Sequence, residues 1–313
     1  MPVSLTTPTT EQLADIVTTL GSWQRDGAPF QLHPGDLGWH ARKGPADTAA
    51  ALRVWARDGR TVAIGLLDGE DLLRMTCAPD LLADPVLARA IAGDIHDPGR
   101  GVLPAGPVYV EAPVGAALHH SLAHLGWEVG EEWTPLQLTL EQDVIDESRT
   151  LRIEVATDDL ADEWLAVTTA AFQAPSASPT SATAPSPSQV QSPSPSLSTQ
   201  ALARWRAMVS SAAYEGARAL VGYDEQNRPV AAICVWSAGP GRPGIIEPLG
   251  VHPDARGRGF GRSITLAGAC ELWRLGASNA LVATPSNNVG AVATYLAAGF
   301  SELPHRRDLQ RSA

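Results

Sequence analysis

A turn rich in glycine and arginine, placed between an apolar strand and a helix, constrains this chain more than any other feature. The strand is predicted over residues 245–251, and the turn follows at residues 256–262. Its glycines and arginines are Arg256, Gly257, Arg258, Gly259, Gly261 and Arg262. Because glycine has no Cβ, a ligand can approach the backbone there, and amides at a helix N-terminus attract anions. Guanidinium groups add planar, positively charged donors that suit phosphate oxygens. The turn therefore predicts a pyrophosphate cradle.

The class of pyrophosphate ligand is narrowed by residues that the turn lacks. A Walker loop needs a lysine after its glycines, and a dinucleotide site needs an acidic residue about twenty positions later. The turn has no lysine, and the next predicted strand, residues 279–284, ends without an acidic residue. The sequence therefore matches neither kind of site. What the turn does contain is the pattern Arg-x-x-Gly-x-Gly, and a second motif follows it after one helix and one strand. The residues of that second motif are Asn288, Ala291, Thr294, Tyr295, Gly299 and Phe300.

The two motifs, in this order and at this spacing, resemble those of the GCN5-related N-acetyltransferases (GNAT). The resemblance covers residues 150–310. It implies acetyl-CoA as the acyl donor and the amine of a small molecule or peptide as the acceptor, with direct attack in a ternary complex. It also implies the cofactor-binding residues, which are Leu249, Gly250, Val251, Arg256, Gly257, Arg258, Gly259, Phe260, Gly261, Arg262 and Asn288. One departure is Thr294, where the family usually has leucine, and we interpret it as a packing change.

Glu247 and Tyr295 are the candidate catalytic residues. Acetyl transfer from a thioester to an amine needs a proton acceptor for the amine, a backbone N–H for the carbonyl oxygen and a proton donor for the thiolate. The resemblance gives the donor role to Tyr295. Glu247 lies on the strand before the turn, where its carboxylate could accept the proton or hold a cationic substrate. The alternatives are a pair between Glu247 and a neighbouring arginine, and a core position for Tyr295.

The order of predicted elements favours an α/β (α+β) fold with a mixed, mostly antiparallel twisted sheet flanked by helices. Residues 150–313 are expected to form an active domain of this kind. Residues 1–145 are expected to form a second, degenerate domain in tandem, because residues 116–127 look like a worn copy of the second motif. No Arg-x-x-Gly-x-Gly precedes that copy, residues 77–97 are short of glycine, and the tyrosine is missing. Such a domain would shape the acceptor pocket or stabilise the pair, and an unrelated α+β domain is the alternative.

Residues 174–198 consist almost entirely of serine, proline, alanine and threonine, without charge. A segment with so little apolar surface cannot offset the entropy of ordering, so we expect it to be disordered. We place it as an insertion between the first two helices of the active domain. It is either a mobile lid over the acceptor site or a tolerated surface insertion.

Composition favours a soluble, cytoplasmic protein without a nucleic-acid or membrane partner. The net charge is -11, no apolar run is long enough to span a bilayer, and the first residues lack a signal-peptide pattern. The three cysteines are expected to be buried, reduced thiols. No metal is expected, because His119, His120 and His124 lack further ligands nearby. A homodimer is left open.

Two classes of function are consistent with the sequence. One is an acetyl-CoA-dependent N-acetyltransferase. The other is a non-catalytic module that binds acyl-CoA or a protein partner and keeps the cradle. Retention of Glu247, Asn288 and Tyr295 favours the enzyme, because a protein that only bound the cofactor would have no use for a thiolate-protonating tyrosine.

Overall fold

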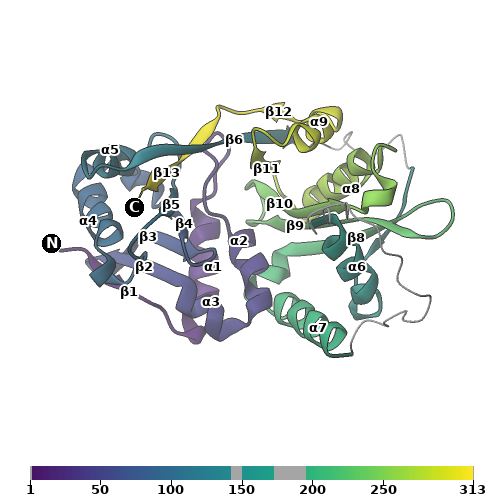
Figure 1. Ribbon diagram of the computed structural model, residues 1–313, viewed down its shortest axis with the longest axis horizontal. Helices are drawn as coiled ribbons and strands as arrows, with labels where there is room; N and C mark the ends of the chain where they lie inside the picture. Colours follow the sequence, from purple (N-terminus) through teal and green to yellow (C-terminus); the bar gives the residue numbers. More distant parts are fainter. Residues whose placement is uncertain (1, 142–149, 173–194, 313) are drawn as a thin grey trace, which may run out of the picture.

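The computed structural model describes residues 2–141, 150–172 and 195–312; we call the first range the N-terminal half and the other two the C-terminal half. The N-terminal half contains β1 (Ser4–Thr6), α1 (Leu13–Trp23), α2 (Pro34–His40), α3 (Pro45–Ala51), β2 (Leu52–Arg57), β3 (Arg60–Leu67), β4 (Leu72–Cys77), α4 (Pro85–His96), β5 (Val108–Glu111), α5 (Ala117–His124) and β6 (Glu128–Thr139) (Figure 1). The C-terminal half contains β7 (Arg152–Val155), α6 (Ala161–Phe172), α7 (Pro195–Val209), β8 (Ala217–Tyr223), β9 (Pro229–Ser237), β10 (Gly244–Val251), α8 (Phe260–Arg274), β11 (Asn279–Pro285), α9 (Val289–Ala297), β12 (Ser301–Glu302) and β13 (Arg306–Arg311).

The described strands form one sheet in the order β1-β2-β3-β4-β5-β13-β6-β11-β10-β9-β8-β7, with β12 beside β6. Within the described residues only the pairs β4–β5 and β10–β11 are parallel. This confirms the mixed, mostly antiparallel sheet that the sequence predicts.

Two strands cross between the halves of the molecule. β6 pairs with β11 of the C-terminal half along Asn279–Pro285. β13, the last strand, lies between β5 and β6 and pairs with both. The halves therefore cannot separate without breaking backbone hydrogen bonds, each of which would have to be replaced by water.

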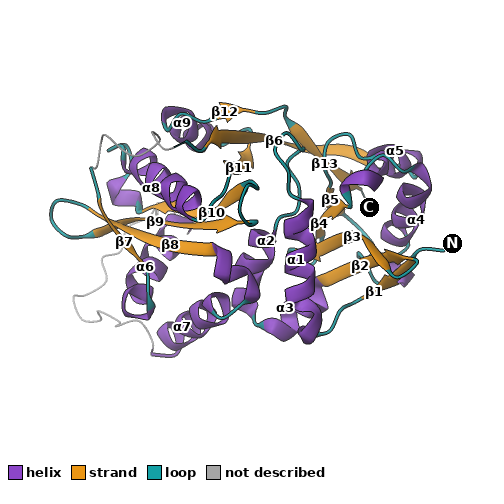
Figure 2. Cartoon of the chain, turned by 180° about the vertical axis from the view of Figure 1, so that it is seen from behind, coloured by secondary structure: helices purple, strands orange, loops and turns teal. Residues whose placement is uncertain are grey.

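Each face of the sheet has its own packed core, because alternate strand residues point to opposite faces. In the C-terminal half, Leu220 and Ile233 pack in the cluster that contains residues of α8. Ala219 and Cys234 pack on the other face with the α6 and α7 residues Trp164 and Trp205. In Figure 2, α1 and α2 lie between the strands of the two halves. The halves therefore share helical packing as well as a sheet.

Most of the predicted elements are present with small shifts in their bounds. A hairpin turn at Asp224 joins β8 and β9, and the Asp224 carboxylate accepts hydrogen bonds from the Arg228 backbone and side chain. Of the predicted disordered segment, residues 174–194 lie outside the described residues, and residues 195–198 open α7. All three cysteines are free and buried, as expected. No helix in the described ranges is long and apolar enough to cross a membrane.

Gly38 of α2 gives a test of the packing between the halves. A Cβ on Gly38 would overlap the ring of Trp236 on β9. We expect Gly38→Ala to lower the free energy of unfolding by about 1–3 kcal/mol, because overpacking costs more than the gain in helix propensity. Gly93→Ala in α4 is the matched control, since its Cβ would meet nothing within 4 Å. Urea unfolding that showed equal stability for both variants would contradict this account of the packing.

Candidate functional site

The strands β10 and β11 diverge at the centre of the C-terminal half. Among the described residues they pair only at Gly244 and Ile245. On its other side β10 pairs with β9 and shifts register between Ile246 and Leu249. Past Ile245, the side of β10 that faces β11 is therefore free of a neighbouring strand. An exposed strand edge of this kind offers backbone N–H and C=O groups to an extended ligand.

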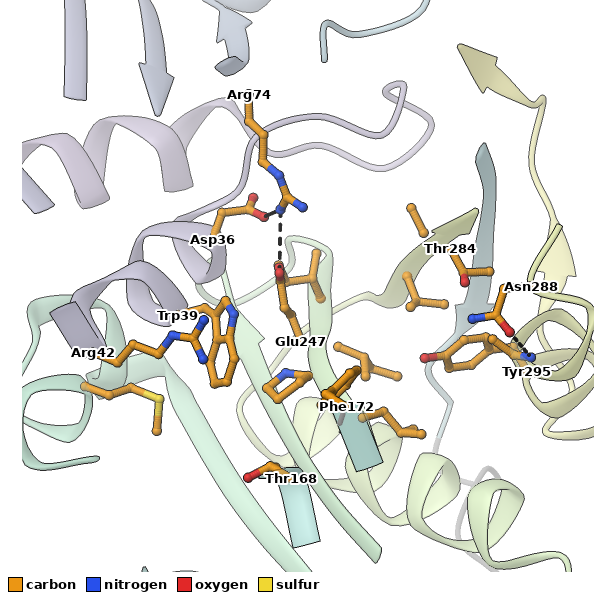
Figure 3. Close-up of a pocket in the computed structure, with 18 of the residues that line it drawn as sticks. Asp36, Trp39, Arg42, Arg74, Thr168, Phe172, Glu247, Thr284, Asn288 and Tyr295 are labelled. Carbon is orange, nitrogen blue, oxygen red and sulfur yellow. Dashed lines mark hydrogen bonds and ion pairs between the residues drawn. The ribbon is translucent and has the colours of Figure 1, made fainter. Parts of the chain in front are cut away.

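A cavity of about 570 Å³ lies where the strands diverge and reaches the N-terminal half (Figure 3). Its C-terminal lining includes Thr168, Phe172, Arg204, Glu247, Leu249, Thr284, Asn288 and Tyr295. Its N-terminal lining includes Phe30, Asp36, Trp39, Arg42, Arg74, Glu111 and Trp133. The cavity therefore brings both candidate catalytic residues together and adds groups from the other half of the chain.

Glu247 is held at the cavity wall by its backbone. The indole Nε1 of Trp236 donates a hydrogen bond of 2.6 Å to the Glu247 carbonyl. The side chain is 24% exposed, and one of its oxygens lies 3.5 Å from a guanidinium nitrogen of Arg74. Burial and the nearby charge of Asp36 raise the pKa of the Glu247 carboxyl well above its usual value, while Arg74 acts in the opposite direction. Its arginine partner thus comes from the other half of the molecule, and its surroundings favour the protonated carboxyl more than water does.

Tyr295 and Asn288 face the same cavity from α9 (Figure 3). Tyr295 is 7% exposed, and its ring lies 5.6 Å from that of Phe300. Burial, and then the charge of Glu247, raise the pKa of the Tyr295 hydroxyl, so it stays protonated at neutral pH. Asn288 caps α9, because its side-chain oxygen accepts a hydrogen bond of 3.2 Å from the Ala291 amide. Tyr295 is therefore both a core aromatic and a hydroxyl donor at the cavity.

The glycine turn opens α8 with an accessible backbone. Gly259 is the N-cap with φ 82°, and Gly257 has φ 73°. A Cβ on either glycine would meet nothing within 4 Å, so the space in front of the turn is clear. A Cβ on Gly261, by contrast, would lie 2.9 Å from the methyl group of Thr294. Thr294, which stands where the family usually has leucine, thus packs against the turn. Gly257 and Gly259 leave room for an anion at the helix N-terminus.

The arginines of the turn hold its surroundings together. Arg256 donates to the Ala171 carbonyl in the last turn of α6 at 2.9 Å and to the Val251 carbonyl at 3.3 Å. The Arg262 Nε donates to the Ala297 carbonyl at the end of α9 at 2.8 Å. Both guanidinium groups therefore bind helix C-termini, where cations are favoured, and they still add positive charge beside α8.

The remaining predicted cofactor residues lie along β10 and at the start of α8. Leu249 lines the cavity. A Cβ on Gly250 would lie 2.6 Å from the Cβ of Ala171, so this glycine allows α6 to approach the strand. Phe260 is buried, and the guanidinium of Arg258 lies 4.8 Å from the centre of its ring. These contacts connect β10, the turn and α6.

The sequence interpretation missed a buried charged cluster from the N-terminal half. Arg74 of β4 lies 2.8 Å from Asp36 of α2 and 3.6 Å from Glu111 at the end of β5. Glu111 also lies 3.1 Å from Arg306 of β13. The guanidinium of Arg306 lies 5.1 Å from the ring centre of Trp133. No local motif marks these residues, because three-dimensional strand order alone brings them together.

The N-terminal half has no counterpart of the glycine cradle at α4. Asp84 caps that helix and accepts hydrogen bonds from the amides of Val86 and Leu87. It also pairs with Arg57 at 2.8 Å. A carboxylate thus satisfies the amides that would otherwise be open to a phosphate. On α5, His120 and His124 contact each other at 2.8 Å, and no group of three metal-binding side chains occurs among the described residues.

Arg74 provides a test of the charged cluster. We expect Arg74→Met to lower the free energy of unfolding by about 3–5 kcal/mol, because buried carboxylates would lose their cation. The loss should shrink as the pH falls and Glu247, whose pKa is raised, becomes protonated. Arg60→Met is the control, since Arg60 and Asp80 form an exposed pair at 2.6 Å, and little change is expected there. Denaturant unfolding at several pH values measures both, and a loss at Arg74 no larger than at Arg60 would contradict the prediction.

Comparison with curated proteins shows short regions of similarity to enzymes of one name. The chain is 40% identical over 63 residues to a mycothiol acetyltransferase of Geodermatophilus obscurus, covering 20% of each chain. It is 33% identical over 95 residues to a mycothiol acetyltransferase of Nocardioides sp., covering 30% of this chain and 32% of the relative. The matches therefore span about a fifth to a third of the length of these relatives.

Solved structures match the chain over its whole length. The tandem GNAT protein from the clavulanic acid biosynthesis pathway has a TM-score of 0.59 at 13% identity, covering 99% of this chain and 98% of that one. A GCN5-related N-acetyltransferase from Sphaerobacter thermophilus has a TM-score of 0.54 at 16% identity, covering 99% and 95%. At these identities the likeness shows the fold alone. Residues 186–300 match the family model described as Acetyltransferase (GNAT) family, and this match bears out the resemblance that the two motifs indicate.

Proposed function

We propose that the protein is an N-acetyltransferase that moves an acetyl group from acetyl-CoA to an amine by direct attack. The observation that carries the proposal is the shared cavity of Glu247 and Tyr295 at the divergence of β10 and β11. A proton acceptor and a proton donor on opposite sides of one cavity are the two groups that aminolysis of a thioester requires.

The residues present fit the acyl donor. The open turn at Gly257 and Gly259 would hold the pyrophosphate on the amides at the α8 N-terminus. The unpaired side of β10 from Ile246 to Leu249 would hold the pantetheine arm through backbone hydrogen bonds. Asn288, exposed at the start of α9, would contact the same arm. Bound acetyl-CoA supplies the reactive thioester.

Glu247 acts as the proton acceptor in this scheme. Its carboxyl faces the cavity beside Asp36, and its raised pKa makes it a stronger base than an exposed glutamate. These carboxylates attract an ammonium group that enters the cavity, and the ammonium must give up a proton before its nitrogen can attack. A backbone N–H on the unpaired side of β10 would stabilise negative charge on the carbonyl oxygen.

Tyr295 acts as the proton donor to the departing sulfur. Its hydroxyl stays protonated because burial and Glu247 raise its pKa. A buried phenol that lines the cavity can deliver this proton to the departing sulfur.

We further propose that residues 150–313 carry the active domain and residues 1–145 a degenerate copy. The Asp84 cap on α4 supports this division, since it occupies the place that Gly259 has on α8. The copy would form the acceptor side of the cavity, to which it contributes Asp36, Trp39 and Arg74. The crossing of β6 and β13 would join the two domains permanently.

The acceptor is proposed at the level of its class, the amine of a small molecule or peptide. Relatives named mycothiol acetyltransferase match too little of their own length to assign one molecule to this chain. An excess of carboxylates over arginines around Glu247 supports a cationic acceptor. The second candidate function, an acyl-CoA-binding module without catalysis, would keep the cradle but would not need Glu247 or Tyr295.

Acetyl-CoA binding tests the cradle. Wild type should bind one acetyl-CoA per chain, and Gly259→Asp should abolish binding, because it places a carboxylate at the helix N-terminus intended for the pyrophosphate. Isothermal titration calorimetry measures both, with Gly126→Asp in the N-terminal half as the control, since that glycine also has positive φ and open space around it. Two bound acetyl-CoA molecules per chain would contradict the assignment of a degenerate N-terminal copy. If the wild-type protein bound no acetyl-CoA, the proposed function would be wrong.

The pH profile of turnover tests the two catalytic assignments. With kcat/KM expressed per unprotonated amine, the wild-type rate should rise with pH through the raised pKa of Glu247 and then level off, because the base must be unprotonated. Glu247→Gln should remove this rise of the rate with pH and lower the rate about a hundredfold or more. Tyr295→Phe should keep the rise of the rate with pH and the acetyl-CoA affinity, but lower kcat by about ten- to a thousandfold. An unchanged profile in Glu247→Gln would exclude it as the base, and normal turnover in both variants would favour the binding module.

A further inference from the structure

Two arginines line the cavity from opposite halves of the molecule. Arg42 belongs to the 3-10 turn Ala41–Lys43, directly after α2. Arg204 belongs to α7, which packs against that turn. Both side chains contribute to the lining of the same cavity as Glu247 and Tyr295. The structure thus gathers positive charge at one side of an otherwise acidic cavity.

Arg42 is held in a fixed orientation. Its guanidinium lies 3.7 Å from the ring centre of Trp39, and such stacking fixes the plane of the fork while its N–H edges stay available. Trp39 in turn makes an edge-to-face contact with Trp164, with 6.3 Å between the ring centres. In Figure 3, Arg42 and Trp39 lie on one side of Glu247, and Asn288 and Tyr295 lie on the other. The arginine is therefore on the side away from the proposed donor site.

Neither guanidinium forms a direct ion pair with a carboxylate in the part of the chain that the structure describes. Arg74 and Arg306, which line the same cavity, each pair with carboxylates, whereas Arg42 and Arg204 form no such ion pair and no side-chain hydrogen bond there. The sequence joining α6 to α7, residues 173–194, has no acidic residue. Burial lowers the pKa of the half-buried Arg42, the charges of Asp68 and Glu247 raise it, and the charge of Arg204 lowers it. The two guanidinium groups therefore lie close enough to repel each other.

We propose that the acceptor amine carries an anionic oxygen group, a carboxylate or a phosphate, that binds between Arg42 and Arg204. The inference rests on the proposed function and specifies its substrate class. The amine end faces Asp36 and Glu247, and the anionic end faces the two arginines. Planar guanidinium forks bind carboxylate and phosphate oxygens in pairs. The two charged ends of such an acceptor match the two charged sides of the cavity.

The experiment compares amines that differ only in this group. Purified full-length protein with acetyl-CoA is offered ω-amino carboxylates from glycine to 6-aminohexanoate and L-amino acids, each beside its neutral amide. O-phosphoethanolamine is offered beside ethanolamine. Release of CoA thiol gives kcat/KM per unprotonated amine, and calorimetry gives the affinity of the same amines for the protein saturated with CoA. The best anionic amine should exceed its neutral partner about tenfold or more, as expected for charge-assisted hydrogen bonds. Comparing the amino carboxylates with O-phosphoethanolamine shows whether the site binds a carboxylate or a phosphate.

Variants assign the preference to the two arginines. Arg42→Gln and Arg204→Gln should each reduce the ratio of anionic to neutral amine towards one, while Arg42→Lys should keep part of it. Arg206→Gln is the control, since Arg206 is an exposed arginine on the same helix that does not line the cavity, and it should retain the wild-type ratio. Because Arg204 is exposed, its substitution should leave folding intact.

The outcomes separate this inference from the proposed function. Equal binding and turnover of anionic and neutral amines by wild type would overturn it, and so would the failure of every anionic amine to bind. A weaker affinity for acetyl-CoA in Arg42→Gln or Arg204→Gln would also overturn it, because the arginines would then serve the donor. If wild type does not bind acetyl-CoA at all, the proposed function itself fails.

Discussion

The insertion of β13 between β5 and β6 is the constraint on which the site depends. This pairing places Arg306, the first residue of β13, 3.1 Å from Glu111 at the end of β5. The parallel pairing of β4 with β5 then sets Glu111 opposite Arg74, and Arg74 reaches Glu247 on β10. A continuous series of charges thus runs from the last strand of the chain, through the N-terminal half, to the candidate base. The sheet that joins the halves therefore also sets the electrostatic environment of the site.

Such a cluster is costly for stability, which argues that it has another purpose. Taking ions from water into a protein interior carries a penalty that ion pairs often fail to recover. Glu111 Oε1, Arg74 Nε and Arg306 Nε are buried and lack a hydrogen-bond partner among the described residues. Apolar residues in these positions would fold the sheet at lower cost. Within this cavity burial and the charge of Asp36 raise the pKa of Glu247, and Arg74 limits that rise.

The sequence was sufficient to predict the local parts of this molecule. The turn at Gly257 and Gly259 and the cap at Asn288 depend on neighbouring residues, so their motifs predict them directly. The mostly antiparallel sheet also follows from the order of elements. The crossing of β6 and β13, by contrast, depends on pairing between residues far apart in the chain, which no local pattern specifies. Asp36, Arg42 and Arg74 could not be predicted as site residues for the same reason, since their relevance depends on where α2 and β4 lie.

The contrast between α4 and α8 supports the proposal that the two halves of the chain have different tasks. Both helices begin with open amides, which need an acceptor. At α4 the Asp84 carboxylate supplies it from within the chain and is itself neutralised by Arg57. At α8 the cap is Gly259, which has no side chain to supply, so a phosphate can take that place. Because the α4 amides are satisfied within the chain, the contribution of the N-terminal half to the cavity comes from α2 and the following turn, where Asp36 and Arg42 face the proposed acceptor.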